Sequence, residues 1–173
     1  ITGVDLINES EAEVAELLDL RFGQTKLVLA APEESDIKSA DDITEDMIVA
    51  TEFPVLTRKY LNEKGLDLKI IKLSGSTEAA PFIGIADLIT DLTSTGTTLK
   101  MNHLKIIDNI LDSTIKLIAN KESLETRSEL IEAVSTSIKG VLDADRKKLI
   151  MMNVKDDDLN NVMKVLDEDH YGL

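Results

Sequence analysis

The feature that most constrains the fold is an alternation of short apolar runs with helix-forming segments through the middle of the chain. Pro54 marks a helix start and Gly65 a helix end, and Ser76 and Thr77 are candidate N-caps for a second, shorter helix. Strands that alternate with helices are typical of βα units, so the sequence predicts an α/β fold with a mainly parallel, helix-covered sheet. The predicted strands are residues 25–31, 47–50, 67–73 and 88–92.

The two ends of the chain carry further helix and strand signals. Ser10 and Glu13 have the spacing of a capping box, and the apolar residues behind them predict a helix that ends near Leu20. A single strand and helix at the C-terminus cannot bury an apolar face alone, so they predict the start of a small further domain. The expected later elements are one or two strands in residues 104–119, a helix over residues 123–143, a strand over residues 147–154 and a helix from Asp156.

The composition excludes several classes of protein. The net charge of −14 repels nucleic acid and anionic membranes, so neither is an expected partner. The chain has no cysteine, and its two histidines, His103 and His170, are too few for a histidine-rich metal site. Because no apolar run has the length of a membrane span and the first residues do not resemble a signal peptide, we expect a cytoplasmic protein.

A hydroxyl-rich stretch, residues 91–99, follows the last predicted strand of the alternating region. Gly96 lets the backbone approach an anion closely, and consecutive N–H groups in such a turn can hold a phosphate without a positive charge. The net negative charge of the chain does not attract phosphates. A bound phosphate must therefore be held by these N–H groups, by a bound cation or by basic residues outside this sequence. The candidate phosphate-binding residues are Ser94, Thr95, Gly96, Thr97 and Thr98.

Two carboxylates flank this stretch. Asp91, at the strand end, is placed to accept hydrogen bonds from sugar hydroxyls, and Glu78 can serve the same site from the preceding short helix. Taken alone, a Thr-Gly-Thr run is more often an ordinary loop and Asp91 an ordinary cap. The position of Thr51 and Glu52 at a helix start favours a capping role for them. A lone histidine in a polar stretch, such as His103, favours a surface position.

The wider spacing resembles the signature of the ATP phosphoribosyltransferase family in its long form, which carries a C-terminal regulatory domain. The resemblance extends to the segments ITGVD, LRFGQTKLVLAA, IVATEFP and STIKLIAN, and thus to nearly the whole chain. The signature positions are Glu78, Gly84, Ala86, Ile89, Asp91, Leu92, Thr95, Gly96, Thr98 and Leu99.

This resemblance implies a two-lobed catalytic fold similar to type II periplasmic binding proteins, followed by the start of a ferredoxin-like regulatory domain. It also implies that basic contacts before Ile1 and the rest of the regulatory domain after Leu173 are absent, so we expect a polypeptide with these ends to be inactive or partly unfolded and to lack inhibition by histidine. The implied division is residues 1–32 in lobe I, residues 33–103 in lobe II with the phosphate loop, residues 104–122 returning to lobe I, residues 123–145 as a connecting helix and residues 146–173 as the regulatory start.

The resemblance further implies transfer of phosphoribosyl from phosphoribosyl pyrophosphate to N1 of ATP, the first step of histidine biosynthesis. Glu78 and Asp91 would face the ribose and the loop would hold its 5-phosphate, with Mg²⁺ neutralising the leaving group; no catalytic residue and no metal ligand is assigned. Histidine as inhibitor and a homo-oligomer of dimers or hexamers are also implied. The rivals are a non-catalytic ligand-binding module of periplasmic-binding type and a regulatory or assembly subunit.

Overall fold

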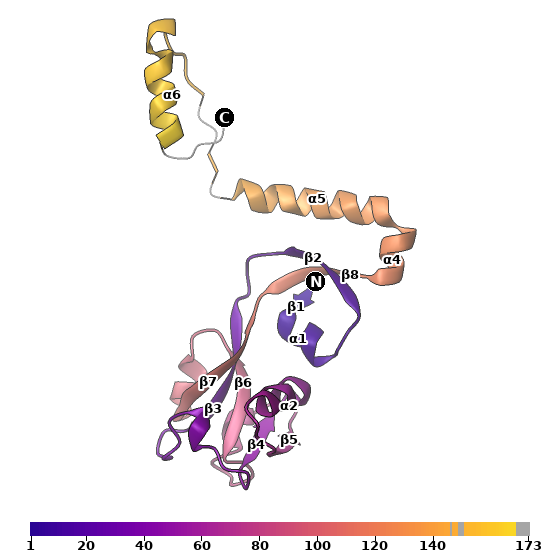
Figure 1. The fold of residues 1–173 in the computed structure, drawn as a ribbon, viewed down its shortest axis with the longest axis vertical. Coiled ribbons are helices and arrows are strands. Elements are labelled where there is room, and N and C mark those ends of the chain that lie inside the picture. The colour runs from indigo at the N-terminus through magenta and orange to yellow at the C-terminus, as the bar shows by residue number, and fades with distance from the viewer. Residues whose placement is uncertain (146, 149–150, 169–173) are drawn as a thin grey trace. The chain divides into compact units, whose positions relative to one another are not determined.

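The computed structural model describes residues 1–145, 147–148 and 151–168, which belong to two compact units, Ile1–Leu142 and Asp143–Leu173 (Figure 1). The first unit is built on two sheets, one of three strands and one of five. No helix within the described ranges is long and apolar enough to cross a membrane. The three-stranded sheet has the order β1 (Thr2–Gly3), β8 (Ile115–Asn120) and β2 (Val14–Asp19), with both pairings antiparallel.

In the five-stranded sheet, four strands run in one direction and β3 runs in the other, between β6 and β7. The prediction of mainly parallel pairing is therefore wrong for two of the four pairings. The chain enters this sheet at Thr25 and leaves it at Ser113, and because these two residues are paired, β3 and β7 must run in opposite directions. The order is β5 (Lys69–Lys72), β4 (Ile48–Thr51), β6 (Leu88–Thr93), β3 (Thr25–Pro32) and β7 (Leu104–Ser113). The four strands predicted between residues 25 and 92 are therefore present.

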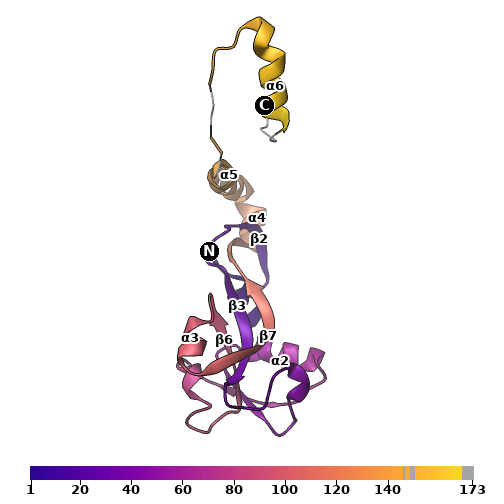
Figure 2. The same cartoon turned by 90° about the vertical axis from the view of Figure 1, so that its left-hand side faces the viewer.

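Helices cover both faces of the five-stranded sheet. The helix α2 (Pro54–Glu63) and the helix α3 (Thr97–Met101) lie on opposite sides of it (Figure 2). Side chains alternate along a strand, so Leu29 packs with Leu61 of α2 while its neighbour Val28 packs with Leu99 of α3. The sheet thus separates two apolar cores and buries its central strands from both sides.

The expected helix from Ser10 to about Leu20 is wrong. The helix α1 (Val4–Glu9) ends at Ser10, and the residues after it form strand β2. That strand pairs antiparallel with β8 over most of its length, from Val14 opposite Asn120 to Asp19 opposite Lys116. Strand pairing with the distant β8 outweighs the local tendency to start a helix at Ser10, because it gives hydrogen bonds to backbone groups along the whole segment.

The C-terminal elements agree only in part with their predictions. The predicted helix over residues 123–143 is two helices, α4 (Lys121–Thr126) and α5 (Ser128–Ala144), which are interrupted at Arg127. In the strand predicted over residues 147–154, residues 149 and 150 lie outside the described part, and the others form no strand. The expected final helix is present as α6 (Leu159–Glu168) after a 3₁₀ turn, while the ferredoxin-like domain stays a prediction; His170 lies outside the described residues.

The sheets change at different places from the predicted lobe boundaries. The chain passes from the three-stranded to the five-stranded sheet between β2 and β3, at residues 20–24, and returns between β7 and β8, at Thr114. The five-stranded sheet therefore contains β3 and β7 together with β4 to β6, whereas the division implied by the resemblance puts residues 25–32 and 104–113 in lobe I. The predicted boundary after residue 32 does not coincide with a change of sheet, because β3 before it and β4 after it lie in the same sheet.

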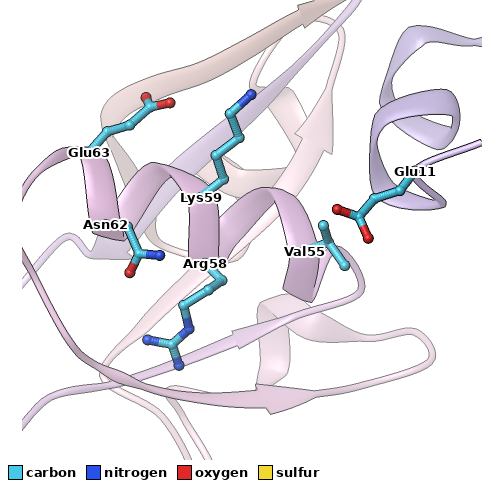
Figure 3. Close-up of a pocket in the computed structure, with 6 residues that line it drawn as sticks. All are labelled: Glu11, Val55, Arg58, Lys59, Asn62 and Glu63. Carbon is cyan, nitrogen blue, oxygen red and sulfur yellow. The ribbon is translucent and has the colours of Figure 1, made fainter.

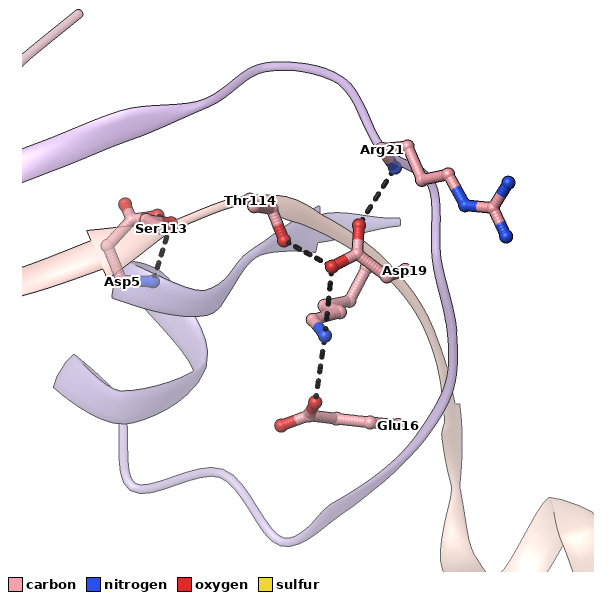
Figure 4. Close-up of polar contacts among 7 residues, drawn as sticks. Asp5, Glu16, Asp19, Arg21, Ser113 and Thr114 are labelled. Carbon is pink, nitrogen blue, oxygen red and sulfur yellow. Dashed lines mark hydrogen bonds and ion pairs between the residues drawn. The ribbon is translucent and has the colours of Figure 1, made fainter. Parts of the chain in front are cut away.

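Asp19 ties the two crossing segments together (Figure 4). Its carboxylate accepts hydrogen bonds from the Arg21 backbone N–H at 2.8 Å and from the Thr114 hydroxyl at 3.0 Å. The Lys116 ammonium lies 3.3 Å from the same group. These contacts, the backbone N–H of Arg21 first, hold the pKa of Asp19 below its usual value.

The substitution Asp19→Asn should lower stability in a pH-dependent way. A carboxyl whose pKa is lower in the folded state stabilises the fold above its unfolded pKa, and this contribution disappears as the pH falls through the folded value. Urea denaturation at about pH 7 should thus show a larger loss than at about pH 2.5. The exposed Asp36→Asn is the control, and an equal loss at both pH values would contradict the assignment.

A second tie joins the helices of the two sheets. Helix α2 has no side-chain cap of its own at Phe53, and the carboxylate of Glu9 from α1 accepts from the backbone N–H groups of Val55 at 3.1 Å and Leu56 at 3.0 Å. The first N–H groups of a helix lack intrahelical partners, and a carboxylate there also meets the positive end of the helix dipole. Glu9 is therefore the N-terminal cap of α2, supplied from 46 residues away.

Replacing Glu9 by alanine should cost about 1–2 kcal/mol of unfolding free energy, the usual range for loss of a cap. Glu9→Gln should lose less, because the amide oxygen still accepts one hydrogen bond. The matched control is Glu13→Ala, which removes only an exposed ion pair with Lys121 at 3.1 Å and should cost less than about 1 kcal/mol. Equal losses for Glu9→Ala and Glu13→Ala would contradict the capping role.

Candidate functional site

The predicted site residues lie at the carboxyl end of the parallel strands β4 and β6. Their register ends with Thr51 opposite Thr90, so the next residues, Glu52 and Asp91, lie at the same edge, where β4 ends and β6 stays paired with β3 only. Ligands of open α/β sheets bind at the carboxyl ends of strands, where the following loops meet. The geometry therefore puts this edge forward as the candidate site.

The hydroxyl-rich loop begins directly after β6 and leads into α3. Gly96 has φ +74° and ψ 0°, a left-handed conformation that side chains with a Cβ adopt at a cost. The Gly96 backbone N–H donates to the Thr93 hydroxyl at 2.8 Å, and the hydroxyls of Thr95 and Thr97 lie 2.8 Å apart. The turn is thus organised by its own side chains, and the Gly96 N–H predicted to hold an anion is bonded within the loop.

The loop combines one buried residue, Leu99, with several exposed hydroxyl side chains. Leu99 is 2% exposed and packs into the core on the α3 face of the sheet, which fixes the first turn of α3. The hydroxyl-bearing residues before it face solvent, where a ligand can reach them. These exposed residues are Ser94, Thr95, Thr97 and Thr98.

The two predicted carboxylates are close enough to influence each other. Glu78 lies on the 3₁₀ turn Thr77–Ala79 and is half-buried, as is Asp91 on β6. Burial, followed by the negative charges of Glu78 and Glu52, raises the pKa of Asp91, which the bonded N–H of Leu92 partly opposes. The structure thus brings Glu78, Asp91 and the start of the loop to one edge.

Glu52 lies at the same sheet edge, although sequence reasoning left it out of the candidate site. It was interpreted as a helix cap, but Phe53 is the N-cap residue of α2, and Glu9 supplies the capping carboxylate. A Cβ added at Gly75 would lie 3.7 Å from the Glu52 carboxylate, so this group faces the segment that leads to Glu78. Its place after β4, next to β6 in the sheet, was not visible without the strand order.

Other candidates lie away from this edge. The His103 side chain is 77% exposed, with its Nδ1 3.8 Å from a Glu33 oxygen, which agrees with the surface position expected for it. A surface pocket along α2 is lined by side chains that include none of the predicted site residues (Figure 3). Its lining residues are Glu11, Val55, Arg58, Lys59, Asn62 and Glu63.

The described side chains form no group of three or more His, Cys, Asp or Glu placed to hold a metal ion. The carboxylates of Glu78 and Asp91 are nevertheless the oxygen ligands that Mg²⁺ prefers, and Mg²⁺ often keeps its waters while it binds substrate phosphates. The residues present therefore fit a magnesium ion that arrives with a phosphorylated substrate better than a resident ion.

Comparison with known proteins decides the family. The sequence profile of the ATP phosphoribosyltransferase family matches residues 1–140. The chain belongs to this family. The ATP phosphoribosyltransferase of Methanothermobacter thermautotrophicus is 54% identical over 166 residues, which cover 96% of this chain and 58% of that protein. That of Methanocaldococcus jannaschii is 55% identical over 170 residues, covering 96% and 59%. The chain thus spans less than two thirds of the relatives' length.

Solved structures agree on the fold. An ATP phosphoribosyl transferase (HisG:HisZ) complex from Thermotoga maritima is 33% identical, with a TM-score of 0.74, 82% of this chain and 68% of that chain being covered. The substrate binding protein of an amino acid ABC transporter gives a TM-score of 0.55 at 16% identity, covering 76% of this chain and 59% of that chain. The α/β fold is therefore shared with this family and with proteins of the periplasmic-binding type.

The raised pKa of Asp91 predicts that this residue costs the protein stability. A carboxyl with a folded pKa above its unfolded value holds its proton more firmly when folded, so its ionisation destabilises the fold as the pH rises past the unfolded value of about 3.8. Asp91→Asn should thus be more stable than the wild type at about pH 7, and this gain should shrink as the pH falls toward 3.8. Denaturation curves at both pH values, with Asp36→Asn as control, measure it; a loss of stability at neutral pH would contradict the assignment.

Proposed function

We propose that this chain carries the phosphoribosyl pyrophosphate site of an ATP phosphoribosyltransferase, the enzyme of the first step of histidine biosynthesis in the cytoplasm. The observation that carries the proposal is the meeting of the Gly96 loop with Glu78 and Asp91 at one sheet edge, in a chain of this family. The chain spans about 58% of its relative from Methanothermobacter thermautotrophicus.

The loop would hold the 5-phosphate of the substrate. Gly96 adds no side chain to the turn, so a phosphate can approach the backbone, and the exposed hydroxyls of Ser94, Thr95, Thr97 and Thr98 are donors in reach of it. Hydroxyl and N–H dipoles stabilise the anion locally even though the whole chain carries a charge of −14. The short Gly96–Thr93 and Thr95–Thr97 bonds hold the turn in shape before the ligand arrives.

The carboxylates would hold the ribose. Carboxylate oxygens accept hydrogen bonds from the 2- and 3-hydroxyls. Asp91 lies on β6 just before the loop, and Glu78 is near enough for its charge to act on Asp91. A bound diol would donate hydrogen bonds to both carboxylates and so offset the repulsion between them. We assign both residues to binding, with no proton transfer.

The reaction is a displacement at ribose C1. The lone pair of adenine N1 forms the new N–C bond while the C1–O bond breaks and pyrophosphate leaves with its electron pair. This chain's residues contribute by fixing the ribose and its phosphate so that C1 faces the nucleotide. Mg²⁺, when bound with the substrate, neutralises charge on the departing pyrophosphate.

Regulation and assembly stay predictions of the family resemblance: inhibition by histidine, and association into dimers and hexamers. The Thermotoga maritima relative was solved as a HisG:HisZ complex, which supports assembly in this family with further subunits. The non-catalytic rival rests on likeness to periplasmic-type proteins, and at 16% identity that likeness concerns the fold alone.

The proposed activity is tested with the full-length polypeptide, ATP, Mg²⁺ and phosphoribosyl pyrophosphate. Phosphoribosyl-ATP should form with one pyrophosphate per product, measured by chromatography and a coupled pyrophosphate assay. Calorimetric titration should show that phosphoribosyl pyrophosphate binds. Absence of both product and binding would overturn the proposal.

Replacing Gly96 by alanine should weaken binding of phosphoribosyl pyrophosphate by about tenfold or more, because a non-glycine residue at φ +74° is strained by about 1–2 kcal/mol and the turn relaxes. Gly65→Ala is the matched control: Gly65 has φ +73°, ends α2, and has nothing within 4 Å of an added Cβ. Gly65→Ala should thus lose stability without losing affinity. Unchanged affinity in Gly96→Ala would contradict the assignment of the loop.

A further inference from the structure

Three threonine hydroxyls form a fully buried cluster just beneath the candidate site. Thr51 on β4, Thr57 on α2 and Thr90 on β6 are each 0% exposed. The Thr90 hydroxyl donates to Thr51 Oγ1 at 2.5 Å, and the hydroxyls of Thr57 and Thr90 lie 2.6 Å apart. Burying polar groups is costly unless they are bonded to each other, so a cluster of three in an apolar core calls for a role.

The cluster sits at the last rung between β4 and β6. The pairing of these strands ends with Thr51 opposite Thr90, and one residue later Asp91 is paired with Val28 of β3 only. Side chains alternate across a sheet, so the two threonines point to the α2 face while Asp91 points to the opposite face, toward the loop and α3. The hydrogen bond between Thr90 and Thr51 therefore lies at the point where β6 stops pairing with β4.

The same hydroxyls shape the turn that carries Glu52. Thr51 Oγ1 accepts the backbone N–H of Phe53 at 2.8 Å, which closes a turn around Glu52. Thr57 donates its hydroxyl to the Phe53 carbonyl at 2.7 Å, so the first turn of α2 is bonded to the same cluster. Glu52 thus leaves β4 from a turn whose two ends are both held by buried threonines.

We propose that the cluster of Thr51, Thr57 and Thr90 is a positioning element that holds Glu52 and Asp91 side by side for ribose binding, so that Glu52 is a third carboxylate of that site. The proposal rests on the proposed function. Apolar side chains of similar shape at all three positions would pack without buried polar atoms, and replacing bonded partners together in this way is often neutral or stabilising. The hydroxyls instead link β4, β6 and α2 at the level where the two carboxylates emerge.

The test compares Thr90→Val with Thr90→Ser in the full-length polypeptide. Valine keeps the volume and removes the hydroxyl, whereas serine keeps the hydroxyl and removes a methyl group. A positioning role predicts that Thr90→Val raises the Kd for phosphoribosyl pyrophosphate about tenfold, while Thr90→Ser stays within about twofold of the wild type. A packing role predicts the reverse order, and that result would overturn the proposal. Thr126→Val, at an exposed threonine of α4, is the matched control and should change nothing.

A second readout needs no substrate. The pKa of Asp91, followed by carbon NMR of its carboxyl group, should fall toward the ordinary value in Thr90→Val, because Asp91 then gains water and moves away from Glu52. Thr90→Ser should leave it raised. If the wild type binds no phosphoribosyl pyrophosphate, the proposed function fails, while the pKa of Asp91 still decides whether the cluster positions the carboxylates. An unchanged pKa in Thr90→Val overturns the positioning role.

Discussion

The arrangement of the site depends on the backbone pairing of β6, which lies between β4 and β3. The parallel ladder to β4 brings Glu52 next to Asp91, and the antiparallel ladder to β3 carries β6 one step further, to the start of the loop. Because β6 is buried on both faces, its register cannot slip without moving apolar side chains into solvent. A strand held in this way is a rigid base for a loop that must meet a ligand accurately.

The second constraint is charge. The proposed polyphosphate site lies in a chain with a net charge of −14, so the attraction must come from local dipoles such as those of the hydroxyl-rich turn at Gly96, from a bound cation or from basic residues outside this sequence. Burial, and after it the charges of Glu78 and Glu52, raises the pKa of Asp91, so keeping this carboxylate at the sheet edge costs stability at neutral pH. Ligand-binding proteins often lose stability at the site and are stabilised by other parts of the fold. Here the hydrogen bonds of Glu9 and Asp19 stabilise the fold at the junctions between the two sheets.

Much of the candidate site could be proposed from the sequence because its signals are local. Gly96 among hydroxyl residues directly after an apolar run indicates a turn after a strand, and the spacing from Glu78 to Leu99 points to the family that comparison with relatives then established. Glu52 and the threonine cluster could not be found in this way. Their significance comes from neighbours 33 to 39 residues away in the chain, which local spacing does not encode.

The sequence by itself determined the α/β class, the strands from residues 25 to 113, the turn at Gly96 and the family, because apolar periodicity and turn residues act over a few positions. Only the tertiary structure decided that residues 14–19 form a strand rather than a helix, that β3 runs against its neighbours, and that Glu9 caps α2. In each of these cases the free energy comes from hydrogen bonds between segments far apart in the chain, and those bonds outweigh local propensity once the segments meet.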